Sequence, residues 1–371
     1  MSIAANDPQS TSDLQKQTQS AFVMLSLITQ ACHGILNTVF IAPDPKPSWF
    51  DDLNDKLDAA KTVATDWIDN LAPGVTGGVP THVIDYGTTY QAFTAKIDAI
   101  ATQYPDAQGA DDPHVKEVHD LIAALEETVQ SILDSAQKTA DQLKGWGDRV
   151  QKAHDELSTG AANIQSAETT LQADIDKMNN AIQTLQDTIH QENIGIAASG
   201  AGIGVGLLLL IVGIALAPET GGASLVVAGT GGLLVIGGAV TWGVMQHKIN
   251  EQFDEIAKDQ AEKDSDQRQI VALQGLAIAS SQSIAYTTDA SSALSNFRTA
   301  WNVFQGELQG VRDKLLHGQS SLRVIVADAF TDAAAQEWQD ATSFAQSLVN
   351  APVSFPSAQL PMSSSTLAAV A

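Results

Sequence analysis

Apolar residues return every seven positions through the middle of the chain. The first series is Val115, Ile122, Val129, Ala136, Leu143, Val150, Leu157, Ile164, Leu171, Met178 and Leu185. A second series lies three residues after members of the first, at Val118, Leu125 and Ile132. Further along, the offset from the first series becomes four residues, at Ala140, Ile175, Ile182 and Ile189. Such heptads predict a helix that packs lengthwise against other helices. We expect this helix to run from Val115 to Glu192, within a rod-like bundle.

Shorter helices are predicted before this long one, over residues 13–40, 49–70 and 83–103. They are separated by PDPKP, APGVTGGVP and YPDAQGADDP. Because proline and glycine interrupt helices, we expect all three separators to be loops.

Helical spacing resumes in the last third of the chain. Apolar residues continue through Leu294, Trp301, Leu308 and Leu315 to a break near Gly318. One further helix is expected to end at about Asn350. The predicted fold class is therefore all-α, with very long helices in an elongated bundle.

Two charge-free apolar segments interrupt the amphipathic pattern, at Ile194–Ala217 and Ala223–Met245. Each is longer than the roughly 20 residues that a helix needs to cross a bilayer. The short joint between them carries Glu219, the only charged residue from Asn193 to Gln246. The pair therefore predicts a hairpin whose tip crosses a membrane with a single carboxylate.

The conformation of this hairpin is left open by its composition. Fourteen of the 27 glycines lie in residues 194–245, which disfavours a stable helix in water. The spacing of Gly200 and Gly204, and of Gly202 and Gly206, suits close helix packing in lipid. The valine-rich and leucine-rich runs suit a β-hairpin equally well. A single apolar run could equally be the buried core of a soluble domain. Two adjacent runs of spanning length favour insertion into a membrane.

We expect the apolar and small residues of both segments to insert into the membrane, with Trp242 at the interface. The candidate inserting residues are Ile194, Gly200, Gly204, Gly206, Leu207, Leu208, Leu209, Leu210, Ile211, Val212, Ile214, Leu225, Val226, Val227, Leu233, Leu234, Val235, Ile236, Val240 and Trp242. The hairpin tip is expected at Pro218, Glu219, Gly221 and Gly222.

This pattern predicts three parts. Residues 1–193 and 246–350 form a discontinuous helical tail bundle, residues 194–245 form a hydrophobic head, and residues 351–371 form a flexible C-terminal tail.

Composition narrows the function. The net charge of −24, from 43 acidic against 19 basic residues, argues against nucleic acid, because phosphate binding needs clustered lysine and arginine. Cys32 is the only cysteine and is expected to be a small buried residue. The N-terminus has no basic region ahead of an apolar one, so export by a non-classical route is expected.

No catalytic or cofactor motif is apparent. GxxxxGK[ST], HExxH and GxSxG do not occur in the sequence. His114, Glu117 and His119 diverge around a helix, and we interpret them as solvated residues at the helix start. We therefore expect no enzyme activity, no metal and no cofactor.

The layout resembles the cytolysin A family of α-helical pore-forming toxins. It is most similar to components of tripartite toxins of the haemolysin BL and non-haemolytic enterotoxin type and their Gram-negative relatives. The resemblance covers roughly residues 13–350 and rests on the order of elements and on the hairpin sequence GIGVGLLLLIVGIAL. It implies a tail bundle, a head built around the hairpin, and assembly of several subunits on a membrane.

The function expected from these features is that of a pore-forming toxin component. It would be secreted soluble, insert its hairpin into a target host-cell membrane and oligomerise there with one or two companion components. The segments contain almost no polar residues, so one companion is expected to supply an amphipathic pore-lining segment. A type III secretion translocator and a resident membrane coiled-coil protein are the alternatives.

The heptads predict a rod in solution. We expect circular dichroism dominated by helix, and a radius of gyration from X-ray scattering well above the value of about 21 Å for a compact chain of this length. A radius near 21 Å would contradict the predicted bundle.

Overall fold

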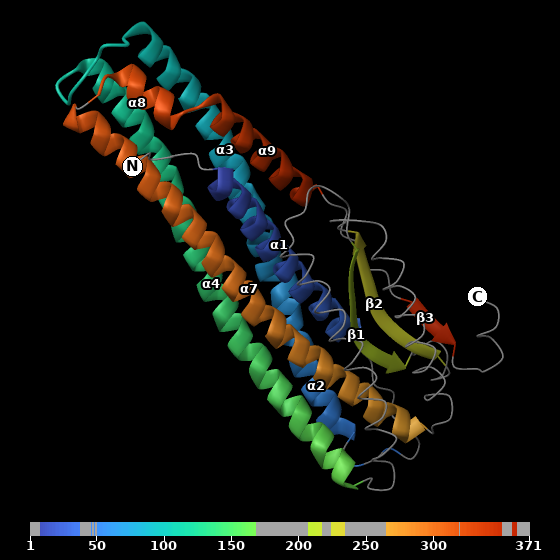
Figure 1. The fold of residues 1–371 in the computed structure, drawn as a ribbon. Helices are drawn as coiled ribbons and strands as arrows, with labels where there is room; N and C mark the ends of the chain where they lie inside the picture. Colours follow the sequence, from blue (N-terminus) through green and yellow to red (C-terminus); the bar gives the residue numbers. More distant parts are fainter. Residues whose placement is uncertain are drawn as a thin grey trace. The chain divides into compact units, whose positions relative to one another are not determined.

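The computed structural model describes residues 8–37, 46, 48, 50–167, 207–216, 224–233, 265–318, 320–350 and 358–361. Its helices are α1 (Pro8–Asn37), α2 (Phe50–Asp66), the π-helix η1 (Trp67–Leu71), α3 (Ala72–Gln103), α4 (Pro113–Ala167), α7 (Ser265–His317), α8 (Leu322–Ala329) and α9 (Asp332–Val349) (Figure 1). Its strands are β1 (Leu207–Leu216), β2 (Ser224–Leu233) and β3 (Ala358–Pro361). The predicted helical fold class is confirmed, with a β-hairpin in the apolar region.

The chain divides into two compact units, which are described separately. Unit 1 comprises residues 1–22, 75–142 and 290–350, and unit 2 comprises residues 23–74, 143–289 and 351–371. Helices α1, α3, α4 and α7 contribute residues to both units. The predicted division into tail bundle, hairpin head and C-terminal tail is a different one and stays a prediction.

Helix α4 begins at Pro113, two residues before the predicted start at Val115. The Oδ1 atom of Asp112 accepts hydrogen bonds from the backbone N–H groups of His114, at 2.8 Å, and Val115, at 3.3 Å. Pro113 occupies the first turn, where its missing N–H would have no partner within the helix. The part of the predicted helix from residue 168 to Glu192 lies outside the described residues.

The first heptad series forms a buried face of α4. Those of its members whose side chains are described are all buried, namely Val115, Ile122, Val129, Ala136, Leu143, Val150 and Leu157. In the second series Thr139 and Ala140 are both only partly buried, and burial resumes at Trp146 and Ala153, fourteen and twenty-one residues after Ile132. The predicted shift at Ala140 is therefore wrong in the described part of α4, because the buried positions Trp146 and Ala153 keep the original register.

Residues 72–80 are helical, although their prolines and glycines predict a loop. The chain passes from α2 through η1 into α3. The N–H of Ala72 donates to the carbonyl of Trp67, a π-type bond, and the next residue, a proline, has no N–H to place. Val75, Val79 and Val83 form a buried stripe at helical spacing. Burying each valine contributes about 1.5–3 kcal/mol, enough to offset the roughly 3 kcal/mol that an interior proline costs.

Aromatic rings from three helices form the core of unit 1. The ring of Tyr86 on α3 lies 5.0 Å from Trp301 on α7 and 4.6 Å from Trp338 on α9, between centroids. Phe304 lies 5.1 Å from Trp338. Each such pair contributes about 0.5–1.5 kcal/mol beyond the area it buries. Both tryptophans are buried packing residues.

A charged group borders this aromatic core. Arg312 on α7 forms an ion pair with Glu126 on α4, and its Nε and Nη2 atoms donate to Nε2 of His119 at 3.2 and 3.0 Å. The side chains of Arg312, Glu126 and His119 are 28%, 15% and 18% exposed. The prediction that His119 is solvated is therefore wrong. Burial raises the pKa of Tyr86 well above its usual value, and the Glu126 carboxylate acts in the same direction.

Two tryptophans form the centre of unit 2. The rings of Trp67 and Trp146 lie 4.7 Å apart. The indole N–H of Trp67 donates to Thr29 Oγ1 at 2.9 Å, and that of Trp146 donates to the carbonyl of Val63 at 3.0 Å. Both buried indoles thus have acceptors, as buried polar groups require. Cys32 is fully buried, as predicted, and burial raises the pKa of its thiol.

The C-terminal helical region contains two helices where the sequence predicts one. The break near Gly318 is confirmed, because α7 ends at His317 and Gly318 has a φ of +61°. A second break falls between α8 and α9. There the Thr331 side chain accepts the N–H of Ala334 at 3.1 Å and caps α9.

We expect Arg312→Gln to lower the free energy of unfolding by about 1–3 kcal/mol, because it leaves the Glu126 carboxylate partly buried without a counter-charge. Urea unfolding followed by circular dichroism measures the change. Arg323→Gln is the matched control, since Arg323 pairs with Asp98 at 2.9 Å with side chains 48% and 64% exposed. Such an exposed pair contributes less than about 1 kcal/mol. Equal losses in the two variants would contradict this difference.

Candidate membrane-inserting hairpin

The central parts of the two apolar segments form an antiparallel β-hairpin (Figure 1). Strand β1 pairs with β2 along their lengths, and residues 217–223 join them. The sequence leaves a helical and a β form open, and this structure has the β form. Leucine, isoleucine and valine make up eight of the ten residues of β1 and four of the ten of β2, which suits a pleated strand.

Large residues of β1 lie opposite glycines of β2 over one half of the hairpin. The pairs are Leu208 with Gly232, Leu209 with Gly231, and Ile211 with Gly229. A glycine adds no cross-strand side-chain pair, and it costs about 0.5–1 kcal/mol relative to alanine within a strand. Backbone hydrogen bonds therefore contribute most of the stability of this half.

The register shifts once, between Ile211 and Ile214. Two residues of β1, Val212 and Gly213, stand there against the single residue Ala228 of β2. One extra residue on one strand is a β-bulge, which bends the strand and increases its twist.

Neither face of the hairpin carries a charge, and apolar residues outnumber polar ones on both. Alternation and the bulge place Leu207, Leu209, Ile211, Ile214, Leu216, Leu225, Val227 and Leu233 at positions of one face. The polar residues of the two strands, Ser224 and Thr230, occupy the other face together with Leu208 and Leu210. An antiparallel sheet in water usually has one polar face. This hairpin therefore needs apolar surroundings on both sides, from protein or from lipid.

A third strand from the C-terminal region completes the sheet. Strand β3 pairs antiparallel with β2, from Ser224 opposite Pro361 to Val227 opposite Ala358. The predicted C-terminal tail, residues 351–371, thus contains four residues that pair with β2. Their sequence, AQLP, is too short to show alternation and contains a proline, which sequence patterns associate with edges or loops.

Eleven of the predicted inserting residues lie in the two strands. They are Leu207, Leu208, Leu209, Leu210, Ile211, Val212, Ile214, Leu225, Val226, Val227 and Leu233. The others lie outside the described residues, as does the predicted tip; they are Ile194, Gly200, Gly204, Gly206, Leu234, Val235, Ile236, Val240, Trp242, Pro218, Glu219, Gly221 and Gly222. Among the helices that the structure describes, none has both the length and the hydropathy needed to span a membrane.

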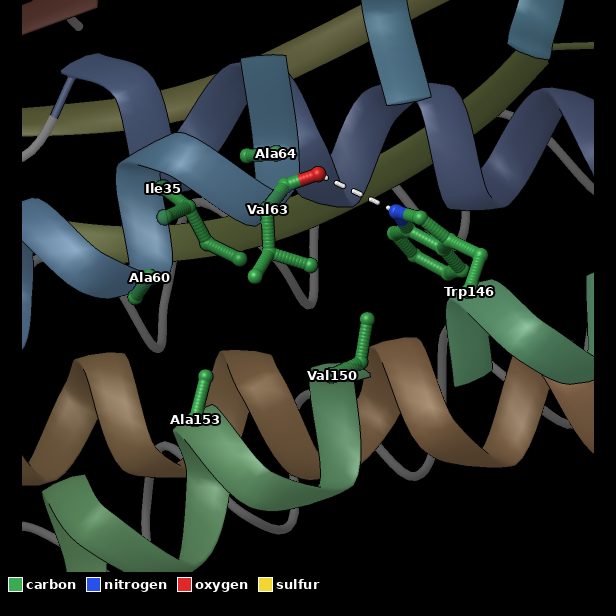
Figure 2. Close-up of a pocket in the computed structure, with 7 residues that line it drawn as sticks. All are labelled: Ile35, Ala60, Val63, Ala64, Trp146, Val150 and Ala153. Carbon is green, nitrogen blue, oxygen red and sulfur yellow. Dashed lines mark hydrogen bonds between the residues drawn. The ribbon is translucent and has the colours of Figure 1, made fainter. Parts of the chain in front are cut away.

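A shallow apolar pocket in unit 2 is a second candidate (Figure 2). Residues of α1, α2 and α4 line it, namely Ile35, Ala60, Val63, Ala64, Trp146, Val150 and Ala153. It holds about 240 Å³ of empty space, its open mouth included, whereas small-molecule sites usually hold roughly 300–1,000 Å³. The indole N–H of Trp146 already donates to the Val63 carbonyl, as Figure 2 shows. The pocket therefore has no free polar side chain to orient a ligand, and we assign it to packing.

The histidines at the start of α4 contact other side chains of the protein. The His114 ring stacks on Tyr104, with centroids 3.4 Å apart, and His119 contacts Arg312. Within the described parts of the chain, no group of three or more His, Cys, Asp and Glu residues is placed to hold a metal ion.

The fold is that of soluble components of tripartite α-pore-forming toxins. Soluble SmhB of the Smh toxin from Serratia marcescens matches with a TM-score of 0.67 at 14% identity, over 93% of each chain. Soluble AhlB of the AHL toxin from Aeromonas hydrophila matches with a TM-score of 0.67 at 16% identity, over 91% of this chain and 92% of AhlB. The Bacillus cereus toxin component HblL1 matches with a TM-score of 0.63 at 14% identity, over 94% of this chain and 98% of HblL1.

The sequence points to the same group of toxins. The model of the Bacillus haemolytic enterotoxin (HBL) family matches residues 45–192 of the chain. No curated protein sequence matches significantly. The resemblance inferred from the order of elements is thus confirmed, because these similar proteins are toxin components.

We expect Leu209→Asp to reduce association with liposomes by about 100-fold, because a carboxylate within the bilayer costs roughly 3 kcal/mol. Flotation with liposomes measures association, and circular dichroism checks that the helices remain folded. Val324→Asp is the control, since it adds the same charge at a residue of α8 that is 50% exposed. Undiminished association of Leu209→Asp would show that β1 does not enter lipid.

Proposed function

We propose that the protein is a component of a tripartite-type α-pore-forming toxin, which is soluble on release and inserts its apolar hairpin into a target membrane. The observation that carries this proposal is the hairpin itself. Two uncharged strands with two apolar faces occur in a chain of net charge −24. The chain also shares its fold with soluble components of pore-forming toxins, which supports a role for this hairpin in membrane entry.

The structure corresponds to the soluble form in this proposal. It matches soluble AhlB with a TM-score of 0.67 and AhlB in its pore with a TM-score of 0.55. Insertion would therefore require a change from the arrangement described here. The glycine-rich half of the hairpin favours such a change, because few side-chain pairs stabilise its β form.

Insertion of the hairpin is energetically reasonable. Leucine, isoleucine and valine each contribute about −0.3 to −0.6 kcal/mol at the centre of a membrane helix. The six residues Leu207–Val212 would thus contribute about −2 to −4 kcal/mol, against roughly 3 kcal/mol for the Glu219 carboxylate at the tip. The remaining apolar residues add to the favourable side.

A water-filled pore needs polar groups that this hairpin lacks. Ser199 is the only polar residue of Ile194–Ala217, and Ala223–Met245 contains only Ser224, Thr230 and Thr241. A segment that lines a pore needs one polar face and one apolar face. We therefore assign the hairpin to anchoring in lipid and to packing against other helices, while one companion component supplies the lining.

The site of action follows from the same proposal. The protein would leave its cell of origin by a non-classical route and act on a host-cell membrane, together with further copies of itself and one or two companions. A type III translocator and a resident membrane protein share the two apolar segments. The likeness to soluble toxin components over more than nine-tenths of the chain favours the toxin component.

We expect the purified chain to associate with liposomes but to release little trapped dye alone. Addition of companion proteins from neighbouring genes should raise the release at least tenfold, because an amphipathic segment then lines the pore. Fluorescence of released calcein measures leakage, and flotation measures association separately.

Two controls separate the contributions. The companions without this chain should also release little dye, and the Leu209→Asp variant should not complement them. Full release by the isolated chain, at the concentration of the complete mixture, would favour a pore made from this component alone.

A further inference from the structure

We propose that β3 is a strap, which holds the hairpin in its soluble form and has to leave β2 before the hairpin can insert. Only the membrane step of this inference rests on the proposed function. The pairing of the strap with β2, and the effect of losing it in water, are independent of any membrane.

The strap is paired at the end of β2 nearest the hairpin tip. Residues 217–223 join the two strands, and β2 begins directly after them at Ser224. All four pairs of β3 fall on Ser224–Val227, the first residues of β2 after this joint. The tip of a hairpin enters the bilayer first, so the strap occupies the part of β2 that has to move earliest.

Chain length leaves almost no slack for insertion while the strap stays paired. Helix α9 ends at Val349 and β3 begins at Ala358. The connecting residues span at most roughly 30 Å even when fully extended. A tip that crosses a hydrocarbon core of about 30 Å, while α9 stays in water, would consume this entire reach. A paired strap would also carry Gln359 and its backbone into lipid, where unpaired polar groups cost several kcal/mol each.

Few backbone hydrogen bonds hold the strap on β2. It is only four residues long, and Pro361, opposite Ser224, has no N–H to donate to the ladder. The same features protect the soluble form, because a short edge strand that carries a proline is a poor template for another strand. The strap therefore covers part of the β2 edge without creating a long new one.

A reversible crosslink tests the strap in the full-length chain. Ser224→Cys with Pro361→Cys, in a Cys32→Ala background, places two cysteines at paired positions. We expect the oxidised form to associate with liposomes at least tenfold less than the same protein after reduction. Mass spectrometry confirms the intramolecular disulfide. Equal association of the oxidised and reduced forms would overturn the inference.

A second variant tests the strap in water. Gln359→Pro removes another N–H from β3, and we expect amide exchange over Ser224–Val227 to rise at least tenfold and binding of an apolar dye to increase. Ser364→Pro, three residues beyond the end of β3, is the matched control and should change neither. Unchanged exchange and dye binding in Gln359→Pro would overturn the strap. If neither wild type nor variants associate with liposomes, the proposed function fails while the exchange result still decides the strap.

Discussion

The uncharged hairpin imposes the main constraint on this molecule. A sheet with two apolar faces gains free energy only where both faces are covered, and water covers neither favourably. The remainder of the sequence is unusually acidic, with a net charge of −24 for the whole chain. The chain thus combines a solvated, negatively charged body with one region that is stable only in apolar surroundings. This contrast distinguishes it from an ordinary helical protein.

The ring clusters of both units consist of helical residues, although the hairpin itself belongs to unit 2. Unit 1 is centred on the rings of Tyr86, Trp301 and Trp338, and unit 2 on Trp67 and Trp146. Their buried indoles and heptad positions are provided by helices that make their backbone hydrogen bonds internally. None of these ring pairs involves a residue of the hairpin strands.

Much of the helical fold was predictable, because it depends on periodicity over long stretches. The first heptad series of α4 is a repeated local signal, and its described members are buried as expected. Residues 72–80 were not predictable in this way, because burial of Val75, Val79 and Val83 overrides the preference of neighbouring prolines and glycines. Strand β3 has no local signal, since its pairing with β2 joins residues more than 100 positions apart. The hairpin conformation stayed open because its sequence suits a strand and a lipid-embedded helix alike.

The length of the strands has a consequence for any conversion to helix. A ten-residue strand measures about 33 Å, which already matches the thickness of a hydrocarbon core. Wound into a helix, the same ten residues measure only about 15 Å. To form a membrane-spanning helix, each strand would therefore need about ten further uncharged residues in total from the adjoining chain. The apolar segments extend well beyond the strands on the side away from the tip, so the chain carries this reserve of length in its sequence.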